Sequence, residues 1–326
     1  MNGKIALEEH FITPEFGQPI VNLSDTRLRE VYRRLLEVEE ERLEGMDKNG
    51  IDFAVLSLNM PGIQSETNPR VAVERSISVN NELASIVARH PNRYAGFAAV
   101  AMQEPSAAAA ELSRCVSDLG FKGAMVHGYT NVGDAETGEY LDEPKCLPFW
   151  ERAESLGVPV YLHPRNPLPG QARIYNGHPE LMAAVWAFTV ETATHALRLI
   201  TSGLFDRFPR LNIILGHMGE TLPFSIWRIE NAYSMGRGGK ELNKPLSAYL
   251  SENFFITTAG NFSTPALLAT MLVVGADRIL FSVDYPWASM DDGSKWFDEA
   301  PISSADRRKI GRVNAERLFG LPSASE

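Results

Sequence analysis

The sequence predicts an α/β protein that folds as a (β/α)8 barrel, and three observations lead to this prediction. The chain has 326 residues, which suits one large barrel as well as two average domains. Short apolar runs recur along its whole length and alternate with helical patterns. The sequence shows no repeat, linker or low-complexity tract, so we expect a single domain over residues 1–326.

The apolar runs predict eight strands. Each run is nearly continuous rather than alternating, which is typical of parallel strands that are covered by other layers on both faces. Several runs follow a glycine or proline that ends the preceding helix, as in SLGVPVYL and RFPRLNIIL. In chain order the predicted strands are residues 4–11, 51–59, 94–101, 123–128, 158–164, 212–219, 254–260 and 278–286.

The segments between these strands carry helical patterns. The clearest predicted helices are residues 26–49, 71–90, 105–119, 190–206 and 303–318. The stretch 164–190 is irregular at its start and follows the fifth strand, where barrel enzymes place active-site loops. The Gly- and Lys-rich segment 234–246 is predicted to be an exposed loop.

Composition excludes several classes of protein. A net charge of -10 argues against a nucleic-acid surface, although a metal or a local arginine can still attract a small anion. Cys115 and Cys146 belong to no CxxC motif and fit a reducing compartment. We see neither a signal peptide nor a membrane-spanning run, so we expect a cytoplasmic protein without membrane partners.

Polar side chains lie at the carboxyl ends of five of the predicted strands. They are His10, His127, His163, His217 and Asp284. Because the carboxyl ends of barrel strands meet at one mouth, we expect these side chains to converge. A single strand histidine is as often a core residue, and Asp284 alone would suit a turn cap, so the joint pattern carries the prediction.

The first strand adds a carboxylate to this group. Glu8 and His10 are two residues apart and therefore face the same side of the strand, whereas Glu9 faces the other side and is predicted to make a structural contact. Together with His163 and Asp284 they offer mixed nitrogen and oxygen ligands of the kind that bind Zn²⁺ or Mn²⁺.

The remaining histidines are given no role in metal binding. His90 and His178 lie in turn-like sequences, and His195 lies in a helical pattern. Glu220, three residues after His217, either orients that imidazole or favours the dipole of a following helix. Both interpretations stay open.

Longer segments carry a resemblance to a known family. They run from residue 3 to about residue 319 and are GKIALEEHF, RLEGMDKNGI, LSRCVSDLGFKGAMVHG, VPVYLHPRNPLP, TSGLFDRFPRLNIILGHMGE, WRIE, ITTAGNF and GADRILFSVDYP. With them the chain resembles the amidohydrolase superfamily of TIM barrels. Within it, the chain is most similar to the aminocarboxymuconate semialdehyde decarboxylase-like enzymes that act on hydroxybenzoates such as γ-resorcylate (2,6-dihydroxybenzoate).

The resemblance implies a metal centre and a reaction. One divalent ion, Zn²⁺ or Mn²⁺, would be held by Glu8, His10, His163 and Asp284, without an organic cofactor. The reaction would be reversible, non-oxidative loss of CO₂ from an ortho-hydroxybenzoate such as 2,6- or 2,3-dihydroxybenzoate. As the mechanism, we expect Asp284 to supply the proton to the ring carbon. It would have to be protonated at some stage, and a metal-bound carboxylate that shares a site with other anions can be pushed that way. The expected assembly is a homotetramer or homodimer.

Further residues are expected to assist the reaction or contact the aromatic acid. His217, oriented by Glu220, would hold substrate oxygens or assist proton transfer. Arg228 would reach the substrate carboxylate or a hydroxyl, with a helix-surface position as the alternative. His127 stands where the resembled enzymes are expected to carry asparagine, which leaves the substitution pattern of the ring open.

Aromatic side chains are expected to wall the substrate ring, with a plain core role as the alternative. They are Trp186, Phe188, Tyr285 and Trp287.

Three other functions remain open on the sequence. A metal-dependent hydrolase of a lactone or amide would share the fold and would be distinguished by its product. A decarboxylase of an acyclic aminomuconate more often carries His-x-His on the first strand, whereas this chain has Glu8-x-His10. A non-catalytic binding protein is disfavoured, because drift would break at least one ligand of the set.

Overall fold

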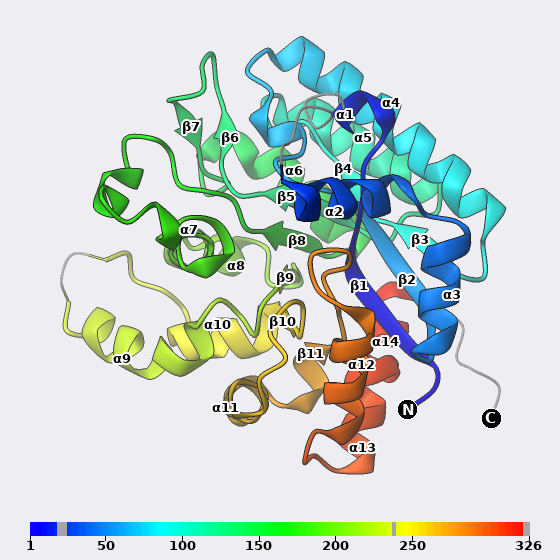
Figure 1. Cartoon of the computed structure of the whole chain (residues 1–326). Helices are drawn as coiled ribbons and strands as arrows, with labels where there is room; N and C mark the ends of the chain where they lie inside the picture. Colours follow the sequence, from blue (N-terminus) through cyan, green and yellow to red (C-terminus); the bar gives the residue numbers. More distant parts are fainter. Residues whose placement is uncertain (18–24, 237–238, 322–326) are drawn as a thin grey trace.

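The computed structural model describes residues 1–17, 25–236 and 239–321, and within these ranges it forms a closed parallel barrel surrounded by helices (Figure 1). All barrel pairs are parallel, as the apolar runs predict. The barrel strands are β1 (Lys4–Phe11), β2 (Ile51–Leu58), β3 (Tyr94–Gly96), β4 (Ala98–Ala99), β5 (Ala124–His127), β8 (Val160–His163), β9 (Ile213–Leu215), β10 (Phe254–Thr257) and β11 (Ile279–Leu280). The predicted fold class is confirmed.

The barrel closes at two junctions between neighbouring strands. The run 94–101, predicted as one strand, bends at Phe97, so that β3 pairs with β2 while β4 pairs with β5. The Phe97 N–H donates to the Leu56 carbonyl at 2.9 Å. The second junction joins β1 to the residues just after β11 through a single bridge between Leu7 and Ser282.

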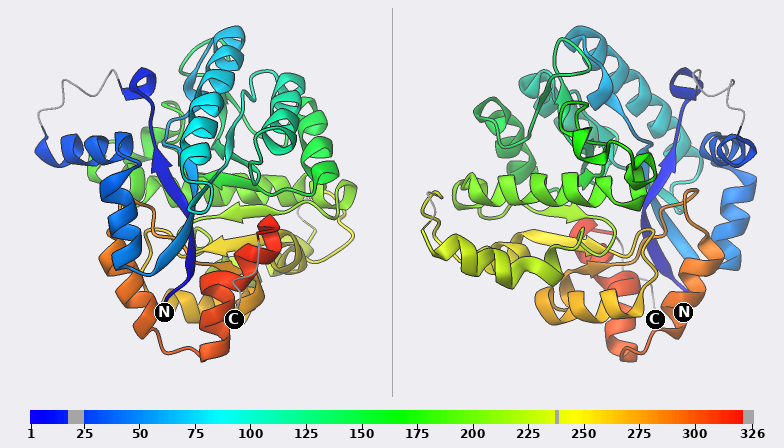
Figure 2. Two further views of the ribbon diagram at one scale, coloured as in Figure 1. Left: turned by 90° about the vertical axis from the view of Figure 1, so that its right-hand side faces the viewer. Right: turned by 60° about the vertical axis from the view of Figure 1, so that its left-hand side comes forward.

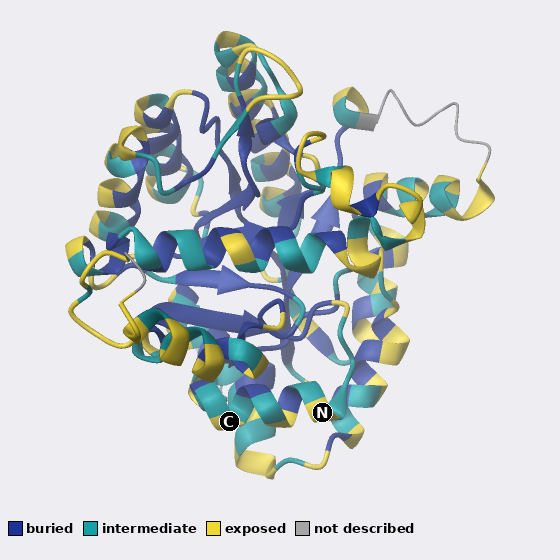
Figure 3. Ribbon diagram, turned by 90° about the vertical axis from the view of Figure 1, so that its left-hand side faces the viewer, coloured by how far each residue is buried: buried dark blue, intermediate teal, exposed yellow. Residues whose placement is uncertain are grey.

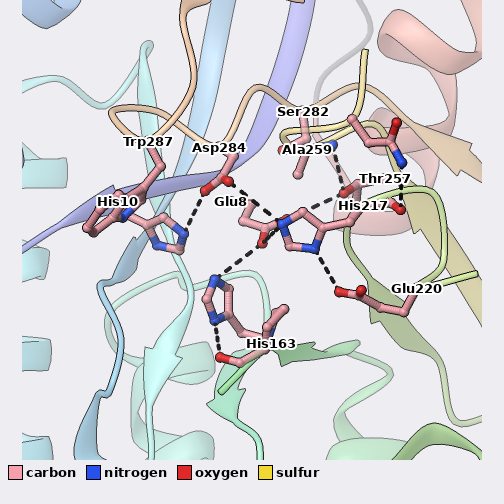
Figure 4. Close-up of polar contacts among 12 residues, drawn as sticks. Glu8, His10, His163, His217, Glu220, Thr257, Ala259, Ser282, Asp284 and Trp287 are labelled. Carbon is pink, nitrogen blue, oxygen red and sulfur yellow. Dashed lines mark hydrogen bonds and ion pairs between the residues drawn. The ribbon is translucent and has the colours of Figure 1, made fainter. Parts of the chain in front are cut away.

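Several strands are shorter at their carboxyl ends than predicted. The run 278–286 is a strand only over Ile279–Leu280, and the run 212–219 only over Ile213–Leu215. The residues beyond these strands leave the hydrogen-bonded ladder and turn into the mouth of the barrel. This early ending allows His217 and Asp284 to face each other across the mouth (Figure 4).

Helices cover the outside of the barrel, with their polar faces toward solvent and the strands buried beneath them (Figures 2 and 3). They are α1 (Pro14–Gly17), α2 (Thr26–Leu36), α3 (Glu40–Lys48), α4 (Pro69–Arg89), α5 (Pro105–Ser117), α6 (Leu147–Leu156), α7 (Ala187–Thr201), α8 (Leu204–Arg207), α9 (Leu222–Ser234), α10 (Leu246–Asn253), α11 (Thr264–Val274), α12 (Met290–Glu299), α13 (Ser304–Arg308) and α14 (Asn314–Phe319). In the described ranges, no helix combines the length and apolarity needed to cross a membrane.

The predicted helix 26–49 is wrong as a single element, because Glu37 interrupts it. Glu37 adopts an extended backbone, and its carboxylate accepts the N–H groups of Glu39 at 2.8 Å and Arg42 at 3.0 Å. These bonds satisfy N–H groups at the start of α3, so the second helix starts anew.

Two other predicted helices are also divided. Gly203, with φ 79°, separates α7 from α8 inside the run 190–206. The run 303–318 contains a π-helical turn, Lys309–Val313, between α13 and α14.

The two predicted loops agree with the structure where it describes them. The stretch 164–190 is irregular and contains three short 3-10 turns before α7 begins. In the segment 234–246, residues 235–236 and 239–241 are exposed, and residues 237–238 lie outside the described residues. A small antiparallel hairpin, β6 (Thr130–Asn131) with β7 (Gly138–Glu139), follows β5.

Side chains fill the inside of the barrel. Ile5, Leu7, Val55, Phe97 and Tyr161 belong to one buried cluster from strands on opposite sides. A packed barrel floor of this kind leaves only the carboxyl ends of the strands open for chemistry.

Candidate active site

Five polar side chains from four strands or their following loops meet at the carboxyl end of the barrel (Figure 4). His10 Nε2 lies 3.3 Å from Asp284 Oδ1, and His163 Nε2 lies 3.3 Å from Glu8 Oε1. His217 Nε2 lies 3.7 Å from both Glu8 Oε1 and Asp284 Oδ2. The structure therefore brings together the residues that the strand-end pattern singled out.

The imidazoles of His163 and His10 turn Nε2 toward the centre of this group. His163 Nδ1 lies 2.9 Å from the Pro164 carbonyl, which can only accept, so Nδ1 carries the proton and Nε2 presents a lone pair. His10 Nδ1 lies 3.1 Å from the Ser57 hydroxyl. Bonds of this kind fix the ring orientation that a metal ligand requires.

The donor set fits a divalent cation. Glu8 Oε1 lies 3.3 Å from His163 Nε2, and without a cation burial raises the pKa of Glu8 to about 8, so a divalent ion at this place would stabilise the charged carboxylate. Among the described residues, Glu8 Oε1 and His10 Nε2 are buried without a hydrogen-bond partner. Donor atoms of Glu8, His10 and His163 all lie within 4.8 Å of one another. Asp284 contributes a further oxygen beside His10.

Unusual backbone conformations present several of these side chains. Glu8, His217, Glu220 and Asp284 have φ values of 64°, 52°, 52° and 75°, in the region that side chains other than glycine rarely occupy. Each such residue costs on the order of 1–3 kcal/mol, and such strain gathers at functional sites. In β1 the strain coincides with a register shift between Leu7 and Glu9, so Glu8 forms a bulge.

Glu9 makes the structural contact that its place on the strand predicts. Its carboxylate accepts the Val283 N–H at 3.0 Å, and burial raises its pKa to about 8. Arg42 donates to the His10 carbonyl at 2.7 Å and lies 4.9 Å from the centre of the Tyr285 ring. These contacts join the first strand to the loop that carries Asp284. Tyr285, expected as a substrate wall, packs against Arg42 instead.

Charges around the site set the proton affinities of His217 and Asp284. Although burial favours a neutral imidazole, the carboxylates of Glu220 and Glu8 raise the pKa of His217 well above its usual value. Burial acts to raise the pKa of Asp284, but the nearby imidazoles of His10 and His217 outweigh it and lower that pKa. In the site without a metal ion the two histidines dominate, and the expected rise in the pKa of metal-bound Asp284 stays a prediction.

Glu220 holds His217 on the side away from the centre. Its Oε1 lies 2.7 Å from His217 Nδ1, and its Oε2 accepts the Thr189 hydroxyl at 2.8 Å. Glu220 is buried and precedes α9, which begins at Leu222, so the orienting interpretation has direct geometric support.

A cavity of about 700 Å³ opens beside His217 and Asp284. Its walls come from α7, α9, α11 and the loop after β11, and they include the predicted aromatic contacts Phe188 and Trp287. The Trp287 indole N–H donates to Asn59 Oδ1 at 2.8 Å, which fixes the plane of the ring.

Besides Tyr285, three further predicted substrate contacts do not line this cavity. Arg228 is exposed and lines a separate groove with residues of α7 and α10, so within one chain the structure places it on the helix surface. Trp186 is largely exposed. His127 is buried at the end of β5, with its ring 4.8 Å from that of His163. It lies deeper than the cavity wall.

The other histidines lie in different surroundings. Nε2 of buried His195 accepts the Leu141 N–H at 3.0 Å, which is a structural contact. His90 contacts Glu39, and His178 is exposed.

Sequence reasoning missed residues that shape the site from beneath. Tyr161 lies two residues before His163 and therefore faces the same side of β8, so the alternation of side chains along the strand could have identified it. Its hydroxyl donates to Glu8 Oε2. Gly62 is also required: a Cβ there would lie 2.3 Å from His127 Nδ1.

Comparisons with known proteins agree with this geometry. Residues 10–321 match a family model described as Amidohydrolase. A γ-resorcylate decarboxylase from a Rhizobium species is 50% identical over 327 residues, which cover 99% of this chain and 100% of that protein. A γ-resorcylate decarboxylase from Rhodococcus jostii is 46% identical, over 98% of this chain and 99% of that protein.

Solved structures show the same likeness. A 2,6-dihydroxybenzoate decarboxylase complexed with 2,6-dihydroxybenzoate superposes with a TM-score of 0.95 at 49% identity, covering 98% of this chain and 100% of that one. A dihydroxybenzoic acid decarboxylase from a Polaromonas species, with bound manganese and 2-nitroresorcinol, has a TM-score of 0.95 at 47% identity, covering 99% of this chain and 98% of that one. The chain therefore belongs to the amidohydrolase family, alongside the γ-resorcylate decarboxylases that it resembles in sequence and in structure.

Proposed function

We propose that the chain is a metal-dependent decarboxylase that removes CO₂ reversibly and without oxidation from an ortho-hydroxybenzoate. 2,6-Dihydroxybenzoate is the first candidate, because relatives with about half of their residues identical are γ-resorcylate decarboxylases. The observation that carries the proposal is the buried cluster of nitrogen and oxygen donors beside a cavity with aromatic walls.

One divalent ion is the proposed cofactor, Mn²⁺ or Zn²⁺, with no organic cofactor. Glu8, His10, His163 and Asp284 would hold it, because their nitrogen and oxygen atoms face one another at 3.3 Å, with Glu8 Oε1 and His10 Nε2 buried and without a hydrogen-bond partner among the described residues. The bound manganese in the Polaromonas enzyme supports the choice of a first-row metal ion.

A bound ion would act as a Lewis acid for the carboxylate and the ortho-hydroxyl oxygen of the substrate. Asp284 takes up a proton from His217, whose pKa is raised, and delivers it to the ring carbon that bears the carboxylate. The electron pair of the breaking C–C bond then returns to the ring, which restores aromaticity as CO₂ leaves. His217 lies 3.7 Å from Asp284 Oδ2 and is placed to exchange that proton, while Glu220 and Thr189 hold its orientation.

The substrate ring would lie between Phe188 and Trp287, which face the same cavity. His127 is proposed to act at the inner end of the site, next to His163. Among the described residues, its Nε2 has no hydrogen-bond partner, which suits a contact with a ring substituent.

A substrate panel tests the proposal. Protein loaded with Mn²⁺ is expected to convert 2,6-dihydroxybenzoate to resorcinol, with deuterium from D₂O at the carbon that lost CO₂, as followed by NMR. High bicarbonate with resorcinol is expected to give the reverse reaction. Benzoates without an ortho-hydroxyl group serve as the control. Failure with every ortho-hydroxybenzoate, or hydrolysis of a lactone or amide panel instead, would contradict the assignment.

We also propose that the chain is one domain and works as a homodimer or homotetramer in the cytoplasm. Phe224 and Trp227 on α9 and Leu272 on neighbouring α11 are 88%, 74% and 88% exposed, and such a patch favours a subunit interface.

The two cysteines that the structure shows as free, Cys115 and Cys146, suit a reducing compartment, which supports the proposed cytoplasmic location.

Light scattering tests the assembly. Trp227→Glu places a charge in the patch and is expected to lower the molar mass of the particle. Ile77→Glu, at a partly exposed position on α4, is the matched control and is expected to leave the mass unchanged. A monomeric wild-type chain, or an unchanged mass for Trp227→Glu, would contradict this interface.

A further inference from the structure

A chain of hydrogen bonds runs beneath Glu8, on the side away from the open cavity. Tyr161 donates its hydroxyl proton to Glu8 Oε2, and its oxygen lies 3.0 Å from Thr257 Oγ1. Thr257 Oγ1 in turn accepts the Ala259 N–H at 3.3 Å. Because the single Tyr161 proton is used on Glu8, the Thr257 proton is free to point at the Tyr161 oxygen or at Glu8 Oε2, 3.5 Å away.

Every donor in this chain is therefore able to point toward the carboxylate. Hydrogen bonds aligned head to tail strengthen one another in a buried setting. Glu8, Tyr161 and Thr257 are fully buried, so water is not positioned to replace a lost member of the chain.

We infer that Tyr161 and Thr257 are positioning residues that make Glu8 a one-oxygen metal ligand, an inference that rests on the proposed function. Tyr161 engages Oε2, and only Oε1 is left to face His163 and His217. Among the described residues, Oε1 has no hydrogen-bond partner.

The backbone at Gly216 packs closely against the Glu8 carboxylate and the Tyr161 hydroxyl. A Cβ at Gly216 would lie 2.8 Å from Glu8 Oε2 and 3.1 Å from the Tyr161 hydroxyl. Only glycine leaves room for the two oxygens at this point of the loop after β9. The bulge at Glu8 turns its side chain toward the barrel axis, where the Tyr161 hydroxyl lies.

The test is metal affinity measured without substrate. Tyr161→Phe keeps the shape of the ring and removes only the hydroxyl group. Because outer hydrogen bonds to a ligand typically contribute 10- to 100-fold to metal affinity, the variant is expected to bind Mn²⁺ more weakly by roughly that factor in a chelator competition assay. Activity is expected to return as Mn²⁺ is raised, because Tyr161 does not touch the substrate.

Three companion variants separate positioning from general damage. Thr257→Val removes the second hydroxyl and is expected to weaken Mn²⁺ binding, whereas Thr257→Ser keeps it and is expected to restore binding. Tyr94→Phe is the matched control, because Tyr94 is equally buried but donates to the Val38 carbonyl at 3.0 Å, away from the site. It is expected to keep wild-type Mn²⁺ affinity.

The outcomes distinguish the inference from the proposed function. Wild-type affinity in Tyr161→Phe, or an equal loss in Tyr94→Phe, would overturn the inference while leaving the function intact. A wild-type chain that neither binds Mn²⁺ nor releases CO₂ would overturn both.

Discussion

Asp284→Asn is expected to lower the decarboxylation rate by on the order of 10³-fold or more at saturating Mn²⁺. Asparagine keeps an oxygen toward the site, so substantial metal binding is expected to remain. It cannot deliver a carboxylic proton to the ring carbon, and it cannot exchange a proton with His217, whose Nε2 lies 3.7 Å from Asp284 Oδ2. The loss should therefore appear in kcat more than in metal content.

Steady-state CO₂ release and elemental analysis on the same samples measure the two quantities. Asp291→Asn is the control, because Asp291 is an exposed carboxylate at the start of α12 whose partner is Lys48. It is expected to keep both activity and metal. A wild-type rate in Asp284→Asn would show that another group supplies the proton.

His163→Ala is expected to lower the affinity for Mn²⁺ by at least about 10²-fold and to abolish measurable turnover at modest metal concentrations. The Pro164 carbonyl holds His163 Nδ1, which turns Nε2 and its lone pair toward Glu8 Oε1 in the proposed metal centre. The alanine side chain has no nitrogen to replace this ligand atom. Removing it also leaves Glu8 Oε1 without its nearest histidine.

His178→Ala is the matched control for this loss. His178 is exposed and pairs with Glu180 far from the strand ends, so its removal is expected to leave metal content unchanged. Full metal occupancy of His163→Ala would remove His163 from the ligand set and would require a different centre.

Much of this fold could be predicted because its signals are local. The apolar runs were long enough to identify each barrel strand, and the residues directly after them marked the catalytic end. His163 is the last residue of β8, at the point where the apolar run ends. The break at Glu37 was not predictable in the same way, because the helical pattern continues through it and the capping bonds to Glu39 and Arg42 become visible only in three dimensions.

The conformation of Glu8 was beyond the sequence pattern. Strict alternation correctly places Glu8 and His10 on one face but sends Leu7 to the other. The bulge, with φ 64° at Glu8, allows Leu7 to pack in the barrel while Glu8 still reaches His163. Nothing in KIALEEHF signals this positive φ, because glutamate rarely adopts it.

Arg228 is a residue whose predicted substrate contact is not found within the single chain. The short motif WRIE lies on α9, whose first turn lines the cavity at Pro223 and Phe224, so a role at the substrate was a reasonable expectation. Position along α9 decides the matter, because the first turn, at Pro223 and Phe224, lines the cavity, whereas Arg228 lies one turn further on and lines the groove beside α7 and α10. Which turn of a helix reaches a cavity is visible only in the packed structure.

Titration of the metal-free chain with Mn²⁺, followed by CO₂ release from 2,6-dihydroxybenzoate, tests the central claim most directly. We predict no turnover before metal is added and a linear rise that stops at one Mn²⁺ per chain. Turnover by metal-free protein, or no turnover at any Mn²⁺ concentration, would contradict it.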